Sequence, residues 1–117
     1  ADIYSEVERF KEVKESIVVG QSWDNDVRII LFIVMNTKFY LTEDLLKKIK
    51  FQIKKNASPR HVPSKIIEVK DIPRTKSGKI VELAVKNILD GNNIKNKEAL
   101  ANPEALKQFK NLKELSN

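Results

Sequence analysis

Residues 29–35 form the longest apolar run in the chain, seven residues of Ile, Leu, Phe, Val and Met. Such a run of β-branched and aromatic residues is typical of a strand buried on both faces, so residues 27–35 are predicted to be the central strand of a sheet. The run is far shorter than the roughly 18 residues that a membrane span requires, and no membrane partner is expected. Residues 13–20 are predicted to be a second strand that ends at Gly20, and the polar residues 23–26 favour a hairpin.

Helix signals surround these strands. Thr42 is predicted to cap a helix that ends near residue 55. Residues 65–69 are predicted to be a short third strand. Further helices are expected at residues 1–10, at residues 80–89 before a C-terminal cap at Gly91, and after Asn102-Pro103, where Leu106, Phe109, Leu112 and Leu115 recur every three residues. This order predicts an α+β fold in which a small mixed or antiparallel sheet of about three main strands packs with helices.

Composition excludes several classes of protein. The 117 residues suffice for one compact domain and not for two. The chain has no cysteine, which excludes disulfides and thiol catalysis and is typical of a cytoplasmic protein. Since His61 is the one histidine, we expect no metal site. The amino end shows no signal-peptide pattern. The net charge of +6 is compatible with phosphate-bearing partners, although lysine-rich helices that are simply soluble account for it as well.

The segment Pro73-Arg74-Thr75-Lys76-Ser77-Gly78-Lys79, here called the lysine loop, lies between the third predicted strand and the next helix. It is no P-loop, because it has a single glycine and no Ser or Thr after Lys79. A single-strand nucleic-acid site is disfavoured, since no aromatic residue lies between Phe51 and Phe109. A solvated turn stays open. In the other interpretation, Pro73 rigidifies the loop, Gly78 takes positive φ or approaches a ligand, Ser77 caps the following helix, and Lys79 is presented to a phosphoryl or acyl-phosphate group.

The lysine loop resembles the lysine motif near the end of acyl-adenylate-forming enzymes. This superfamily includes acyl-CoA synthetases, luciferases and the adenylation domains of peptide synthetases. The pattern Pro-x-Thr-x-Ser-Gly-Lys follows a short strand, and the resemblance extends over essentially all 117 residues. Three segments are most similar to the branch of the superfamily that activates acetoacetate, namely residues 58–63, 80–86 and 96–103.

The resemblance implies that the chain is the small C-terminal lid domain of an AMP-forming acyl-CoA ligase, a single domain over residues 1–117. Residues 92–117 would be a C-terminal extension, and residues 91–102, at its start, are the one candidate linker. ATP, Mg²⁺, CoA and a short carboxylate such as acetoacetate would bind mainly to a large N-terminal domain, which is absent from this sequence. The lid domain would close over that partner in two orientations, one for forming acyl-AMP and pyrophosphate and one for attack by CoA. Alone it is predicted to be inactive and to bind none of these ligands tightly.

The same resemblance assigns roles to individual residues. Lys79 would be the catalytic lysine of adenylation, and acetylation of its amine would silence the enzyme because it removes the charge. Lys54 and Arg60 are candidate CoA contacts, although surface positions explain them equally well or better. The loop around Lys79 would be shaped by Pro73, Arg74, Thr75, Ser77 and Gly78.

Two other functions stay open. One is the C-terminal domain of another short-chain acyl-CoA synthetase, because the acyl substrate is selected by the domain that is absent. The other, of a different class, is a basic module that binds nucleic acid or an acidic protein; it would show a salt-dependent affinity for oligonucleotides. The motif favours the ligase, so no nucleic-acid partner is expected.

Overall fold

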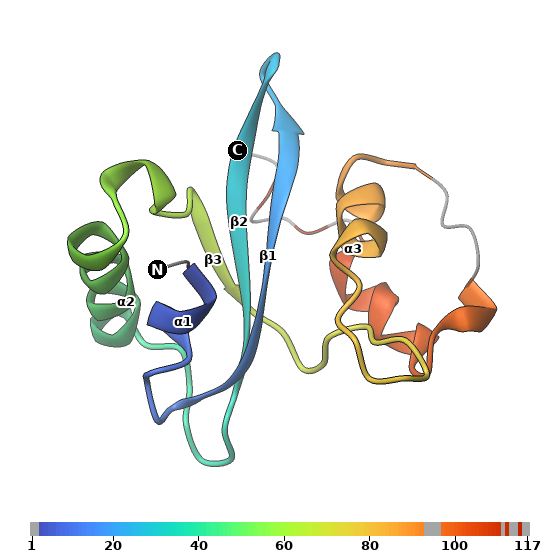
Figure 1. The fold of residues 1–117 in the computed structure, drawn as a ribbon, viewed down its shortest axis with the longest axis horizontal. Coiled ribbons are helices and arrows are strands. Elements are labelled where there is room, and N and C mark those ends of the chain that lie inside the picture. The colour runs from blue at the N-terminus through green and yellow to red at the C-terminus, as the bar shows by residue number, and fades with distance from the viewer. Residues whose placement is uncertain (1–2, 93–96, 111, 113–114, 116–117) are drawn as a thin grey trace.

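A mixed three-stranded sheet forms the middle of the molecule (Figure 1). The computed structural model describes residues 3–92, 97–110, 112 and 115. Strands β1 (Val13–Trp23), β2 (Asp26–Met35) and β3 (Lys65–Glu68) follow one another in the order β1-β2-β3. β1 and β2 are antiparallel, whereas β2 and β3 are parallel. The α+β fold with a small mixed sheet of three strands is therefore confirmed.

β2 is the central strand and is covered on both faces, as its apolar run predicted. Ile30, Phe32 and Val34 belong to one core, and Leu31 and Ile33 belong to the other. This division follows from strand geometry, in which successive side chains point to opposite faces. All five side chains are buried.

A two-residue turn joins β1 to β2. Asp24 and Asn25 have φ values of 51° and 62°, and Trp23 pairs with Asp26. Two adjacent residues with positive φ between paired strands are the geometry of a type I′ hairpin turn. The predicted hairpin is confirmed.

The prediction that the first strand ends at Gly20 is wrong. Gly20 lies inside the ladder, opposite Ile29, and β1 continues to Trp23. A Cβ atom at Gly20 would lie 2.8 Å from Cγ1 of Val27. The glycine therefore permits a close cross-strand approach and does not end the strand.

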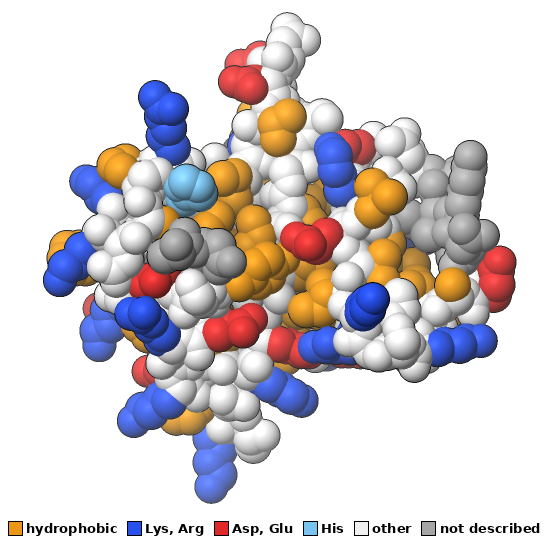
Figure 2. Space-filling view, viewed as in Figure 1, with side chains coloured by type: hydrophobic (Ala, Val, Ile, Leu, Met, Phe, Trp, Pro, Cys, Tyr) orange, Lys and Arg blue, Asp and Glu red, His pale blue; other side chains and the backbone are white. Residues whose placement is uncertain are grey.

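Helices α1 (Ile3–Val7) and α2 (Glu43–Asn56) cover one face of the sheet (Figure 1). The predicted cap is confirmed, because the Thr42 hydroxyl accepts a hydrogen bond from the Leu45 amide at 3.2 Å. α1 ends at Val7 and not at the predicted residue 10, because the chain turns at residues 8–12 to enter β1; residues 1 and 2 of the predicted helix lie outside the described residues. Lys and Arg side chains project from the α2 side of the molecule (Figure 2).

Helix α3 (Glu82–Leu89) and the 3₁₀ helix η3 (Pro103–Phe109) cover the opposite face. Phe109 of η3 packs edge-on against Phe32 of β2, with ring centroids 4.8 Å apart and planes at 83°. Gly91 has a φ of 79°, and its amide donates to the Ile88 carbonyl at 3.1 Å. The predicted glycine cap at the end of this helix is confirmed.

The trailing helix differs from its prediction. It is a 3₁₀ helix over Pro103–Phe109, and Asn102 makes no side-chain capping bond to it. A 3₁₀ helix has three residues per turn, so the three-residue spacing of Leu106 and Phe109 places both on one buried side. Two further short 3₁₀ helices are η1 (Pro59–His61) and η2 (Lys97–Ala99). In the described part of the chain, no helix combines the length and apolarity of a membrane span.

One buried carboxylate joins α1 to α2. Glu6 is 1% exposed, and its Oε1 accepts hydrogen bonds from Asn56 Nδ2 at 2.8 Å and Gln52 Nε2 at 3.2 Å. The hydrogen bond from Asn56 is the largest cause that holds the pKa of Glu6 below its ordinary value; burial opposes it, and Gln52 and Arg9 reinforce it.

We therefore expect Glu6 to stabilise the fold in its ionised form. A carboxyl whose pKa is lowered by folding contributes stability above its unfolded pKa, about 4.3, and that stability is lost as the pH falls through the folded pKa. The contribution is measured as the free energy of unfolding in urea, at several pH values, of the unsubstituted protein and of Glu6→Gln. The parent is expected to be more stable near neutrality, and the difference should shrink in acid. A difference that does not change with pH would contradict the role of the charge.

Candidate functional site

The lysine loop is a tight hairpin. The Gly78 amide donates to the Thr75 carbonyl at 2.9 Å, and the Thr75 amide donates to the Lys79 carbonyl at 2.8 Å. Arg74 and Ile80 pair as an antiparallel bridge on either side of the turn. Gly78 has a φ of 91°. This pattern is that of a three-residue hairpin loop that ends in a glycine bulge, and it requires the positive φ.

Two hydroxyls support the turn from inside. Thr75 Oγ1 accepts a hydrogen bond from the Lys79 amide at 3.1 Å and lies 2.9 Å from Ser77 Oγ. The prediction that Ser77 caps the next helix is wrong. α3 begins at Glu82 without a side-chain cap, because residues 74–80 pair with each other before the helix starts.

Lys79 lies just past the tip of this hairpin and is exposed. Its backbone is fixed by the two hydrogen bonds to Thr75. Within the part of the chain that the structure describes, no carboxylate forms an ion pair with the Lys79 ammonium. A rigid backbone therefore presents a cation that is free to meet an external anion.

Arg74, by contrast, is held within the domain. Its guanidinium pairs with the Glu15 carboxylate of β1, and its Nη1 donates to the Gly78 carbonyl at 3.2 Å. The side chain crosses the hairpin and fastens it to the sheet. Arg74 therefore anchors the loop, whereas Lys79 makes no ion pair with a described carboxylate.

A β-bulge brings Glu15 to this position. Val13 contributes to the core under α1 and α2, whereas Ile17 contributes to the opposite core. The register shifts between Val13 and Glu15. One extra residue reverses the alternation of side chains, so Glu15 shares the face of Ile17, where Arg74 lies.

Pro73 and Ile72 join the loop to the core. Both are buried, and Ile72 belongs to the core that contains Phe32 and Phe109. The Pro73 carbonyl accepts a hydrogen bond from the Val81 amide at 3.2 Å, which closes the base of the hairpin.

The start of α3 is fastened by Tyr4 of α1. Its hydroxyl donates to Glu82 Oε2 at 2.7 Å and accepts a hydrogen bond from the Val18 amide at 2.9 Å. Burial is the largest cause that raises the pKa of Tyr4 far above its ordinary value, and the bond to Glu82 adds to it. Tyr4 therefore stays neutral and keeps donating to the first residue of α3.

The two candidate CoA contacts lie apart from the lysine loop. Lys54 is exposed in the last turn of α2, and Arg60 is exposed in η1. These elements pack on the sheet face opposite to the core that holds Ile72. His61 lies beside Arg60, with its Nδ1 2.6 Å from Ser58 Oγ. The structure thus brings neither Lys54 nor Arg60 to Lys79.

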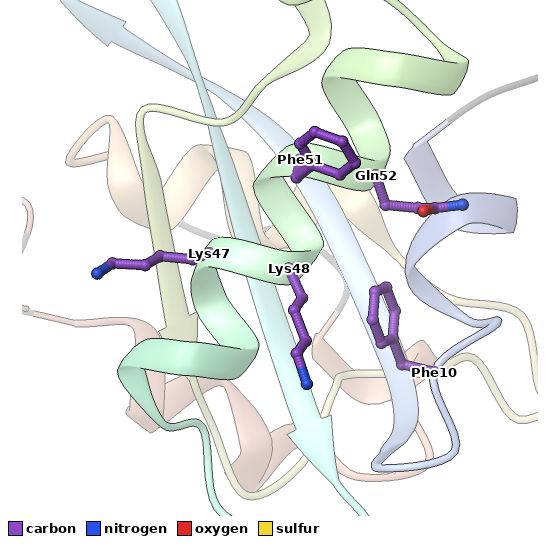
Figure 3. A pocket seen from close by; sticks show the side chains of 5 residues that line it. All are labelled: Phe10, Lys47, Lys48, Phe51 and Gln52. Atoms are coloured by element: carbon purple, nitrogen blue, oxygen red, sulfur yellow. The ribbon is translucent and has the colours of Figure 1, made fainter.

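An open pocket of about 410 Å³ does lie on the α2 side (Figure 3). Phe10 and Phe51 provide its aromatic walls, and Lys47, Lys48 and Gln52 provide polar groups. Neither Lys54 nor Arg60 lines it. Among the described residues, no cluster of three or more histidine or acidic side chains is arranged to hold a metal ion.

Replacing Gly78 by alanine is expected to lower stability by about 1–2 kcal/mol through backbone strain. A Cβ atom at Gly78 would meet no other atom within 4 Å, so no steric clash contributes. Gly78→Asn is the matched control, because asparagine adopts positive φ more readily and should be less destabilising. Urea unfolding measures both variants; equal stability of Gly78→Ala and the parent would show that the hairpin does not need this conformation.

Comparison with known proteins gives a consistent result. Residues 5–79 match the family described as AMP-binding enzyme C-terminal domain. The chain is 56% identical over 117 residues to acetoacetyl-coenzyme A synthetase of Rhizobium meliloti, covering 100% of this chain and 18% of that protein. It is 46% identical over 118 residues to acetoacetyl-CoA synthetase of Xenopus tropicalis, again covering 100% of this chain and 18% of the relative. The chain therefore spans less than one-fifth of the length of these relatives.

Solved structures agree in fold. Acetoacetyl-CoA synthetase from Streptomyces lividans superposes with a TM-score of 0.83 at 37% identity, covering 92% of this chain and 16% of that one. A Brucella canis acyl-CoA synthetase superposes with a TM-score of 0.68 at 26% identity, covering 74% of this chain and 16% of that one. Since the family match covers more than half of the sequence and ends at the lysine of the hairpin, the chain belongs to the AMP-binding enzyme C-terminal domain family.

Proposed function

We propose that the chain is the C-terminal domain of an AMP-forming acyl-CoA ligase, and more narrowly of an acetoacetyl-CoA synthetase. The reaction would be acetoacetate + ATP + CoA to acetoacetyl-CoA + AMP + pyrophosphate. The family match and the relatives named acetoacetyl-CoA synthetase, which align over the whole chain, support this assignment. The observation that carries it is the exposed Lys79 ammonium, which lies on a hydrogen-bonded hairpin and has no ion pair with any carboxylate that the structure describes.

Lys79 would act in the first half-reaction. When the carboxylate attacks the α-phosphate of ATP, negative charge accumulates on the phosphoryl oxygens and on the departing pyrophosphate. An oriented ammonium in a site closed to water stabilises that charge. The side chain is long and flexible, whereas its backbone is held by Thr75. The Lys79 ammonium would therefore enter and leave the adenylation site as the whole domain moves.

The second half-reaction would use another face. Lys54 and Arg60 lie on the side of α2 and η1, across the sheet from the core that holds the base of the lysine loop. A domain that rotates between two docked orientations would present Lys79 in one of them and this basic side, as a contact for CoA phosphates, in the other. The separation of the two sites supports such an alternation.

The partner of this domain would be the large N-terminal domain of the same enzyme, which would bind ATP and the carboxylate. The described residues offer no cluster of metal-binding side chains, so we assign them no role in holding the Mg²⁺ that accompanies ATP. The chain alone is expected to form no acyl-AMP. The absence of cysteine supports a cytoplasmic enzyme.

Separate assays of the two half-reactions test the proposal in the full-length synthetase. Acyl-AMP formation is followed as pyrophosphate released from ATP and acetoacetate without CoA. Thioester formation is followed from supplied acetoacetyl-AMP and CoA. The proposal requires Lys79 for the first assay and not for the second. Pyrophosphate release with acetoacetate, and not with acetate or other short acids, would support the narrower assignment; the reverse preference would replace it with another short-chain acyl-CoA synthetase.

A further inference from the structure

The chain that enters the lysine loop leaves the sheet before it reaches the hairpin. β3 ends at Glu68, and the Val69 amide still donates to the Ile33 carbonyl of β2 at 2.9 Å. Beyond this point the backbone has no strand of the sheet beside it. Apart from the Pro73 carbonyl and the two backbone groups of Thr75, which bond within the hairpin, the backbone of residues 70–75 depends mainly on another segment for hydrogen bonds.

Residues 100–108, here called the brace, provide them. Asn102 makes three of the bonds: its Oδ1 accepts from the Arg74 amide at 2.8 Å, and its Nδ2 donates to Asp71 Oδ2 at 2.8 Å and to the Ile72 carbonyl at 2.9 Å. The Ala101 amide donates to the Arg74 carbonyl at 2.9 Å. Both backbone groups of Arg74 are thus satisfied by the brace.

Gln108 and Leu100 extend the contact at either end. Gln108 Oε1 accepts from the Lys70 and Asp71 amides, and its Nε2 donates to the Asp71 carbonyl at 3.0 Å. Leu100 pairs with Thr75 as an antiparallel bridge at the foot of the hairpin. The brace therefore follows the entering chain from residue 70 to residue 75.

Apolar packing holds the brace in place. Leu100 and Leu106 are buried with Ala84 of α3, and Val81 and Ile88 pack against them. α3 is the element that directly follows the lysine loop. The brace is consequently attached to the chain on both sides of Lys79, before the hairpin and after it.

We propose that the brace is a positioning element for Lys79, with Asn102 and Gln108 as its positioning residues. The inference rests on the proposed function, because it concerns the accuracy with which Lys79 enters the adenylation site. Neither side chain has to contact substrate. They fix the entering strand of the hairpin, and a displacement of a reacting group by about 1 Å can cost about a hundredfold in rate.

The family match ends at residue 79, so the brace lies outside it. The Streptomyces lividans acetoacetyl-CoA synthetase covers 92% of the chain, whereas the Brucella canis acyl-CoA synthetase covers 74%.

The test uses Asn102→Ala in the full-length synthetase, with Lys107→Ala as the matched control. Lys107 lies in η3, the 3₁₀ helix that directly follows Asn102, and is exposed. Asn102→Ala is expected to slow acyl-AMP formation by about tenfold or more, while thioester formation from supplied acyl-AMP stays within about twofold. Lys107→Ala should change neither rate. If Asn102→Ala does not fold, Gln108→Ala serves in its place with the same expectation.

A charge exchange provides the rescue. In Asn102→Asp, two carboxylates face each other at the Asp71 contact, and acyl-AMP formation should fall. Adding Asp71→Asn restores a donor and an acceptor at that contact and should recover part of the rate, which general destabilisation would not predict. Absence of any recovery would count against the brace.

The outcomes separate the two proposals. If Lys79→Ala blocks acyl-AMP formation but Asn102→Ala and Gln108→Ala slow both half-reactions equally or neither, the brace is refuted and the proposed function stands. If Lys79→Ala leaves acyl-AMP formation intact, both are refuted.

Discussion

Replacing Lys79 by alanine in the full-length synthetase is expected to slow acyl-AMP formation by about a hundredfold or more. Removal of one oriented donor to a developing negative charge costs about 3 kcal/mol of transition-state stabilisation. The ammonium is exposed and lacks an ion pair among the described residues, so its loss leaves no buried partner uncompensated. The fold should survive, and the measurement is the rate of pyrophosphate release from ATP and acetoacetate.

Lys76→Ala is the matched control for this experiment. Lys76 is exposed at the corner of the same hairpin and carries the same charge. If the position of the ammonium matters and not merely the net charge of the loop, Lys76→Ala should change the rate of acyl-AMP formation by no more than about twofold. Thioester formation from supplied acyl-AMP should be retained in both variants. Equal damage to both half-reactions by Lys79→Ala would remove the role assigned to this lysine.

Replacing Phe109 by alanine is expected to destabilise the chain by about 3–5 kcal/mol, the usual cost of truncating a buried aromatic side chain. Phe109 is 1% exposed and meets Phe32 of the central strand edge to face. Ile72, just before the lysine loop, belongs to the same core. Chemical denaturation measures the loss, which is a large fraction of the stability of a small domain.

Phe51→Ala provides the comparison for Phe109→Ala. Phe51 is 64% exposed on α2, so its removal should change stability by no more than about 0.5 kcal/mol. If Phe109→Ala were as mild as Phe51→Ala, the 3₁₀ helix η3 would not be an integral part of the core. Residues 103–109 would then be an appendage.

Several elements could be predicted from the residues alone, because their causes are local. The apolar run of residues 29–35 identified the central strand, since only a strand covered on both faces needs no polar side. Thr42 correctly predicted the start of α2, and Gly91 correctly predicted the end of α3. The lysine loop was recognised by its motif. Gly78 was predicted to take positive φ or to approach a ligand, and its φ is positive.

Other predictions failed where a different partner competed with the local signal. Ser77 precedes a helix, but its hydroxyl lies beside Thr75 in the hairpin. Asn102 precedes a proline, as a helix cap often does, but its amide bonds to the chain around Asp71 instead. Gly20 has the appearance of a strand end, but it lies within β1 because Val27 passes close to it.

The sequence by itself determined the family motif, the central strand and the identity of the exposed lysine, since each depends on residues close together in the chain. Only the tertiary structure decided what holds that lysine in place. The Arg74–Glu15 pair depends on a β-bulge that no local pattern marks, and the Asn102 contacts join residues about thirty positions apart. Hydrogen bonds and ion pairs of this kind form when packing brings their partners together, and spacing along the chain does not encode them.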